Sequence, residues 1–273
     1  MGVDEHTTEV AGASVFYRRA PAGDSEVLYL HSVPTSSDDW PALLGLTGGL
    51  APDLPGFGRT SKAGNLDYTL PAYALFVERF LDALDVDEVA VVGHGWGAAI
   101  GLLFAQGHPE RVTRLAIINA VPLLDGFAWP AAARWLRRPV VGELIMGSVN
   151  RRLLTRLLRR ASATEGAWPD ARVSAVWEQF DQGTQRAILR LYRSLDAPAL
   201  AASGAGLADL QQPALVVWGD QDPWLPSMFA DAYAQRLGHA TVEHVPGAGH
   251  WPWLDQPALA ERLAGFATGR GAP

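Results

Sequence analysis

Hydrophobic runs of strand length alternate along the chain with longer segments of helical periodicity. The apolar runs predict strands at residues 8–10, 15–18, 27–31, 46–51, 89–92, 115–119, 214–218 and 241–245. Apolar positions spaced three and four apart predict helices at residues 71–84, 96–106, 227–237 and 257–267. This alternation is typical of a parallel sheet covered by helices on both faces. We therefore expect an α/β fold with a mostly parallel eight-stranded sheet.

The alternation of strands and helices stops in the middle of the chain. The segment after residue 121 keeps a helical pattern, and it is interrupted by Pro130, Pro139, Pro169 and Pro198. We expect a helical lobe inserted after one strand, with the last strands of the sheet following it. The predicted organisation is a core formed by residues 1–121 and 208–273 with a helical insertion at residues 122–207.

Polar and glycine-rich segments follow several of the predicted strands. In chain order they are HSVPTSS around Ser32, GHGWG around Gly95, GDQDP around Asp222 and GAGHW around His250. Parallel sheets of this kind bind ligands at the carboxyl ends of their strands, where such loops meet. An acid, a histidine and a sharp glycine turn at one edge of the sheet predict a catalytic site there.

Composition excludes several classes of function. The net charge of −7 argues against nucleic acid as a partner. The absence of cysteine excludes disulfides and thiolate chemistry, and the histidines show no metal-ligand spacing, so we expect no metal and no cofactor. No run approaches the roughly 20 apolar residues that span a bilayer, and the first ten residues are acidic and polar. We expect a cytoplasmic protein that acts on a small molecule, without nucleic acid or membrane partners.

Five motifs stand at the ends of predicted strands: HSVPTSSDDW, APDLPGFGRTSK, GHGWGAA, DQDPWLP and GAGHWPW. In this order they resemble the α/β-hydrolases, in the branch of the haloalkane dehalogenases and epoxide hydrolases, over nearly the whole chain. The resemblance implies an α/β-hydrolase fold in which the helical insertion at residues 122–207 is the family's cap.

The resemblance also implies a role for individual residues. His250 would be the catalytic base, and Asp222 would orient its ring and support its charged form. The backbone amides of Val33 and Trp96 would form the oxyanion hole. The family's nucleophile is an aspartate in dehalogenases and epoxide hydrolases and a serine in esterases, but here that position is Gly95.

Glycine at this turn removes the nucleophile without harming the fold, because glycine readily adopts the unusual dihedrals of the turn. No acyl-enzyme or alkyl-enzyme ester can form at Gly95, which has no side-chain oxygen. We expect a vacant position, bordered by His250 and the two amides and roomy enough for a water molecule or part of a substrate. A His-Asp base facing it would deprotonate water or the substrate directly, a contribution of about 10²- to 10⁴-fold.

Other departures from the family bear on the choice of reaction. Val33 stands where an asparagine often holds the departing halide, and a cap tryptophan, Trp129 or Trp168, could substitute for it. The cap carries only Tyr192, whereas the epoxide hydrolases that the chain resembles use a pair of tyrosines. Ser32 replaces a family glycine; a local hydrogen bond is the role that we favour for its hydroxyl, and a nucleophile is the alternative.

Aromatic residues are frequent beside the expected centre and in the cap. Ligand pockets are mostly apolar with few polar groups, so we expect an apolar or aromatic substrate of some size. The residues predicted to bind it are Ser32, Phe127, Trp129, Trp168, Trp177, Tyr192, Trp224 and Trp251.

Three functions fit these residues. The first is an α/β-hydrolase-fold enzyme in which His250, oriented by Asp222, is a general base without covalent catalysis. It would act in hydrolysis by water or in a lyase or cyclase step of secondary metabolism. The second is an ordinary dehalogenase, epoxide hydrolase or esterase whose aspartate or serine at position 95 has been changed to glycine. The third is a non-catalytic ligand-binding protein, against which the retained His250 and Asp222 count.

Overall fold

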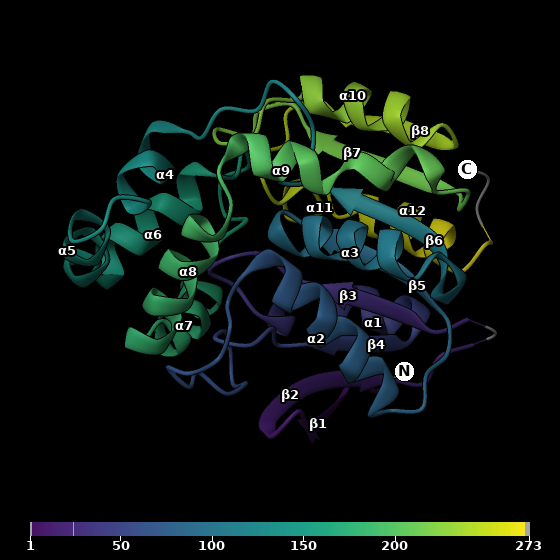
Figure 1. The fold of residues 1–273 in the computed structure, drawn as a ribbon, viewed down its shortest axis with the longest axis horizontal. Coiled ribbons are helices and arrows are strands. Elements are labelled where there is room, and N and C mark those ends of the chain that lie inside the picture. The colour runs from purple at the N-terminus through teal and green to yellow at the C-terminus, as the bar shows by residue number, and fades with distance from the viewer. Residues whose placement is uncertain (1, 24, 271–273) are drawn as a thin grey trace.

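The computed structural model describes residues 2–23 and 25–270, which form one eight-stranded sheet with helices on both faces (Figure 1). The strands are β1 (Asp4–Val10), β2 (Ala13–Ala20), β3 (Val27–Leu30), β4 (Gly49–Pro52), β5 (Val89–His94), β6 (Val112–Ile118), β7 (Ala214–Gly219) and β8 (Ala240–Val245). Their order across the sheet is β1-β2-β4-β3-β5-β6-β7-β8. Strand β2 is antiparallel to β1 and β4, and the other neighbours are parallel. The predicted α/β class with a mostly parallel eight-stranded sheet is confirmed.

The central strands are buried on both faces, which explains their unbroken apolar sequences. Every residue of β3, β5 and β7 is buried, as expected for parallel strands covered by helices. The helices and 3-10 turns of the core are η1 (Ser37–Asp39), α1 (Pro41–Thr47), α2 (Leu70–Asp82), α3 (Trp96–Gly107), η2 (Pro109–Arg111), α10 (Met228–Leu237), α11 (Pro252–Asp255) and α12 (Leu259–Ala267). Helix α1 packs on α12, α2 packs on α3, and α10 packs on β7 and β8.

The structure corrects several predicted strand boundaries. The apolar run at residues 46–51 predicts one strand, but helix α1 continues to Thr47 and β4 begins only at Gly49. Gly48 makes this turn with a φ of +73°, and a Cβ there would lie 2.1 Å from the carbonyl oxygen of Pro21, so a tertiary contact decides the boundary. Strands β1 and β2 are longer than predicted, because the largely exposed edge strand β1 has the polar sequence DEHTTEV.

Helices alone connect β6 to β7, in the segment predicted as a helical insertion. They are α4 (Ala131–Leu136), α5 (Val141–Ser148), α6 (Arg151–Arg160), α7 (Asp170–Gln179), α8 (Gln182–Ser194), α9 (Ala197–Ser203) and η3 (Ala205–Asp209). Figure 1 shows α4 to α8 gathered at one end of the sheet, whereas η3 packs on α3 and α10. The limits of the cap at residues 122 and 207 stay a prediction. Among residues 2–23 and 25–270, no helix has the length and apolar character needed to cross a membrane.

An ion pair between a buried Asp39 and a partly exposed Arg172 joins the loop after β3 to helix α7. Asp39 Oδ1 lies 3.5 Å from Arg172 Nη1, and the Asp39 side chain is 3% exposed. Together with neighbouring residues they line a cavity of about 200 Å³. Burial raises the pKa of the Asp39 carboxyl to about 6, against the opposing effect of the Arg172 charge. The pair therefore makes the junction between core and cap helices sensitive to pH.

Stability is expected to fall as Asp39 ionises. A carboxyl whose pKa is raised on folding contributes stability that is fully present below its unfolded pKa and is lost as the pH rises through about 6. Between about pH 4 and about pH 7, the wild type should lose about 2 kcal/mol more unfolding free energy than Asp39→Asn, which cannot titrate there. Urea unfolding at the two pH values measures this difference. The same pH dependence in both proteins would contradict the prediction.

Candidate active site

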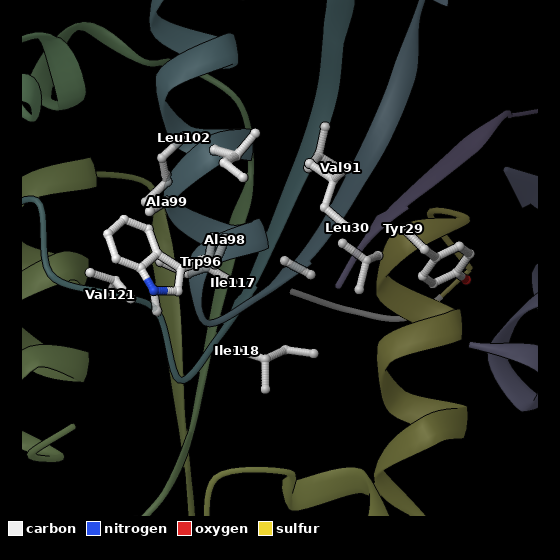
Figure 2. Close-up of a cluster of buried hydrophobic side chains, with 14 of the residues drawn as sticks. Tyr29, Leu30, Val91, Trp96, Ala98, Ala99, Leu102, Ile117, Ile118 and Val121 are labelled. Atoms are coloured by element: carbon white, nitrogen blue, oxygen red, sulfur yellow. The ribbon is translucent and has the colours of Figure 1, made fainter. Parts of the chain in front are cut away.

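A sharp turn joins β5 to α3 at Gly95, where φ is +53° and ψ is −112°. L side chains rarely adopt this conformation, and glycine adopts it without strain. The turn is also closely packed, since a Cβ at Gly97 would lie 2.1 Å from the carbonyl oxygen of Leu30. Figure 2 shows Trp96 at the start of α3 beside Val121, within the apolar cluster that anchors this helix. The sequence GHGWG thus forms an elbow at the carboxyl end of a central strand.

The loops after β7 and β8 bring an acid and a histidine together. His250 Nδ1 lies 2.6 Å from Asp222 Oδ2, and the two side chains are 5% and 0% exposed. An ionised carboxylate accepts only, so this contact places a proton on Nδ1 and leaves a lone pair on Nε2. Nε2 lies 3.5 Å from the position that a Cβ on Gly95 would occupy. The structure therefore turns the basic nitrogen of His250 toward the elbow.

Asp222 is held as a carboxylate by several donors. Its Oδ1 accepts hydrogen bonds from the amides of Trp224 at 2.8 Å and Leu225 at 3.2 Å. Burial acts to raise the pKa of this carboxyl, but the charge of His250 and the hydrogen bonds to it outweigh burial and keep the pKa below its usual value. A carboxylate kept ionised in a buried place can support a positive charge on the imidazole.

Asn119 is a site residue that the sequence analysis missed. It follows β6, and its Nδ2 donates to Asp222 Oδ2 at 2.7 Å while its Oδ1 accepts from the Gly219 amide at 3.0 Å. Its φ of +42° is one that asparagine tolerates better than most residues. Asn119 could have been identified from the sequence by its place as the last residue of the strand predicted at residues 115–119, where site residues are expected. It is a positioning residue for Asp222.

His94 and His31 hold backbone segments of the site. His94 Nε2 lies 2.7 Å from the carbonyl oxygen of His250. His31 Nδ1 lies 2.7 Å from the carbonyl oxygen of Ser32, and its Nε2 accepts from the Leu54 amide at 2.9 Å. Burial lowers the pKa of both imidazoles. They are therefore neutral rings that fix the histidine loop and the loop after β3.

The expected vacancy at Gly95 needs correction. Ser32 Oγ lies 2.2 Å from the position that a Cβ on Gly95 would occupy, and Ser32 Cβ lies 2.8 Å from it. The Trp96 amide, predicted to face the substrate, donates to Ser32 Oγ at 3.2 Å. The Val33 amide has no hydrogen-bond partner in the part of the chain that the structure describes. A serine hydroxyl from the neighbouring loop thus fills the place that a water molecule was expected to fill.

Aromatic rings form two walls beside the elbow and His250. On one side Trp96 stacks on Trp129 at 6.0 Å between ring centroids and contacts Tyr192 at 5.4 Å, and Phe127 packs on Trp129. The indole N–H of Trp129 is buried, and it has no partner among the described residues. The wall also carries the hydroxyl of Tyr192, and the Arg137 guanidinium lies 4.9 Å from the centroid of the Trp129 ring.

The second wall surrounds the imidazole. The ring centroids of Trp224 and Trp251 lie 4.9 and 4.8 Å from that of His250. The ring centroid of Trp168 lies 4.9 Å from that of Trp251. The Trp177 ring stacks on Phe180 at 6.2 Å between centroids and is paired with no ring of either wall, and its role in substrate binding stays a prediction. Among residues 2–23 and 25–270, no group of three or more histidine or acidic side chains is placed to hold a metal ion.

Comparison with known proteins identifies the family. The family described as alpha/beta hydrolase fold matches residues 27–257 of the chain. The chain belongs to this α/β-hydrolase family. A haloalkane dehalogenase of Mycobacterium marinum is 27% identical, and the match covers 96% of this chain and 91% of that relative. The solved haloalkane dehalogenase DbeA of Bradyrhizobium elkani is 26% identical, with a TM-score of 0.85 over 98% of this chain and 99% of that one.

A further relative carries the name of an acetyltransferase component. The dihydrolipoyllysine-residue acetyltransferase component of the acetoin cleaving system of Cupriavidus necator is 30% identical over 91% of this chain, which spans 64% of that relative's length. The predicted resemblance to the dehalogenase and epoxide hydrolase branch is confirmed. The protein is an enzyme of the α/β-hydrolase superfamily, related to haloalkane dehalogenases and other hydrolases.

Proposed function

We propose that this α/β-hydrolase works without a covalent nucleophile, with His250 as a general base oriented by Asp222. The observation that carries the proposal is the 2.6 Å contact of the His-Asp pair beside an elbow that has no side chain. Gly95 offers no atom for an ester intermediate, and the nearest hydroxyl, on Ser32, is bonded to a backbone amide. A base and a set of hydrogen-bond donors remain, which is sufficient for proton transfer.

The substrate class that fits this site is an apolar or aromatic small molecule. Rings form the walls on both sides of the elbow, and few polar groups interrupt them. His250 Nε2 would take a proton from a water molecule that attacks the substrate, or from the substrate itself. The first course is hydrolysis, and the second is a lyase or cyclase step. No cofactor and no macromolecular partner enters either course.

The packing around Gly95 argues against the alternative that glycine replaces the aspartate or serine nucleophile of an ordinary hydrolase. Any side chain at position 95 would bring its Cβ 2.8 Å from Ser32 Cβ, a distance that real Cβ atoms essentially never show. An aspartate or serine at this position would therefore require the loop that carries Ser32 to shift. Ser32 and Gly95 are therefore sterically complementary. A non-catalytic ligand-binding protein would not need the buried His250-Asp222 pair, which counts against that alternative.

Substitution of His250 tests the proposal. A panel containing 4-nitrophenyl acetate, styrene oxide, 1-bromobutane and an aromatic β-hydroxyketone would identify a substrate that the wild type converts. On that substrate, His250→Ala should lower kcat by about 10²- to 10⁴-fold, the usual contribution of a general base.

A surface pair of the same chemistry supplies the control. His244 Nδ1 lies 2.9 Å from Asp220 Oδ1, and both side chains are more than a third exposed. His244→Ala should leave the turnover rate unchanged. Undiminished turnover in His250→Ala, or binding without turnover by the wild type across the panel, would refute the proposed function.

A further inference from the structure

The hydroxyl of Ser32 accepts a hydrogen bond, but it donates none to the residues that the structure describes. A serine hydroxyl accepts through its oxygen and donates through its proton. Ser32 Oγ accepts from the Trp96 amide at 3.2 Å, and no residue in the described part of the chain accepts its proton. Ser32 is 2% exposed. Since a buried donor is costly unless it is bonded, the proton of Ser32 is available to a molecule bound in the site.

The loop after β3 fixes the position of this hydroxyl. The carbonyl oxygen of Ser32 accepts hydrogen bonds from His31 Nδ1 at 2.7 Å and from Thr35 Oγ1 at 3.0 Å. The Leu54 amide donates to His31 Nε2, which leaves the ring proton on Nδ1. These bonds fix the backbone of Ser32, and the bond from the Trp96 amide orients its hydroxyl before a substrate arrives. Such preorganisation is the condition for effective stabilisation of developing charge.

The Trp96 amide strengthens the Ser32 hydroxyl as a donor. This amide belongs to the first residue of α3, a helix of 12 residues, and lies at the positive end of the helix dipole. An oxygen that accepts such a hydrogen bond donates its own proton more strongly, because bonds in a chain polarise one another. The effect of the amide thus reaches the site through Ser32 Oγ.

We propose that the Ser32 hydroxyl, with the Val33 amide, is the hydrogen-bond donor to the reacting oxygen of the substrate. The Trp96 amide then acts on Ser32 and not on the substrate. The substrate class that this arrangement fits is an aromatic carbonyl compound, whose oxygen gains negative charge when His250 removes a proton from it or from an attacking water molecule. The proton moves to His250 Nε2, the charge is stabilised by Ser32 and Val33, and no bond forms to the enzyme.

This inference rests on the proposed function only for the position of the base. A nucleophilic role for Ser32 has less support from the geometry. It would require the hydroxyl proton to pass to His250 Nε2, and no hydrogen bond joins these two atoms among the described residues, whereas the bond from Trp96 is present. Ser32 is therefore assigned as a donor.

Binding of two related ligands tests the assignment without any turnover. 4-Nitrophenolate is an aromatic oxyanion, and nitrobenzene has a similar ring without the charged oxygen. At alkaline pH, Ser32→Ala should bind 4-nitrophenolate about 10-fold more weakly than the wild type, while its affinity for nitrobenzene should not change. Ser36→Ala is the matched control, because Ser36 lies in the same loop, is 3% exposed and accepts a hydrogen bond from the Asp38 amide. It should change neither affinity.

Two outcomes would overturn the inference. They are an unchanged ratio of the two affinities in Ser32→Ala, and a wild type that does not prefer 4-nitrophenolate to nitrobenzene. The measurement does not depend on His250 as a base. A failure of the proposed function would therefore appear in the turnover of His250→Ala and not in these affinities.

Discussion

The double variant Ser32→Gly/Gly95→Ser is expected to hydrolyse 4-nitrophenyl acetate about 10³- to 10⁶-fold faster than the wild type, the range over which a complete catalytic triad acts. The hydroxyl introduced at position 95 would meet His250, because Nε2 lies 3.5 Å from the Cβ position at Gly95. Removal of the Ser32 side chain also frees the Trp96 amide, which could then serve as an oxyanion donor. Initial rates of 4-nitrophenolate release measure the gain.

Neither single substitution is expected to reach this rate. In Gly95→Ser the new Cβ would lie 2.2 Å from Ser32 Oγ, so the loop must shift at a cost of about 1–3 kcal/mol in unfolding free energy. Ser32→Gly alone has no nucleophile. Equal gains in Gly95→Ser and the double variant would contradict the steric relation between the two positions. A folded double variant without any gain would contradict the alignment of His250 with the elbow.

Asp222→Asn is expected to lower turnover by about 10⁴-fold on a substrate that the wild type converts, because it places the imidazole in the wrong tautomer. The asparagine amide can donate to His250 Nδ1, which leaves the ring proton on Nε2 and removes the lone pair that would accept the substrate's proton. The variant also lacks the charge that supports a protonated ring. Steady-state kcat/KM for the two proteins gives the ratio.

The matched control for this variant is Asp220→Asn, in the exposed pair with His244. It should leave kcat/KM unchanged, since an exposed ion pair contributes little beyond its own surroundings. A loss of less than about tenfold in Asp222→Asn would mean that the carboxylate does not set the tautomer of His250.

The sheet and the positions of the acid and histidine were predictable from the sequence because each depends on local pattern. Buried parallel strands have continuous apolar runs, as in β5 and β7. Asp222 lies in the loop after β7 and His250 in the loop after β8, and the carboxyl ends of parallel strands meet at one edge. The boundary between α1 and β4 could not be predicted, because Gly48 turns there against the backbone of Pro21.

The occupant of the elbow could not be predicted from the sequence. Ser32 and Gly95 lie on different loops, and only the packing of the two backbones brings Ser32 Oγ to the place that a side chain at Gly95 would fill. Asn119 was missed because its side chain serves Asp222 from a neighbouring strand. The role of Trp177 in substrate binding stays a prediction, since residue type does not reveal which way a ring on a cap helix points.

The proposal that His250 is a base in a reaction without a covalent intermediate is tested most directly by the intact mass of the protein. The protein is first incubated with diethyl 4-nitrophenyl phosphate, a reagent that phosphorylates activated serines. We expect the wild type to keep its mass and the Ser32→Gly/Gly95→Ser variant to gain a single diethyl phosphoryl group at position 95. A diethyl phosphoryl group on Ser32 of the wild type, absent from His250→Ala, would show that the enzyme uses a displaced serine nucleophile and would contradict the mechanism.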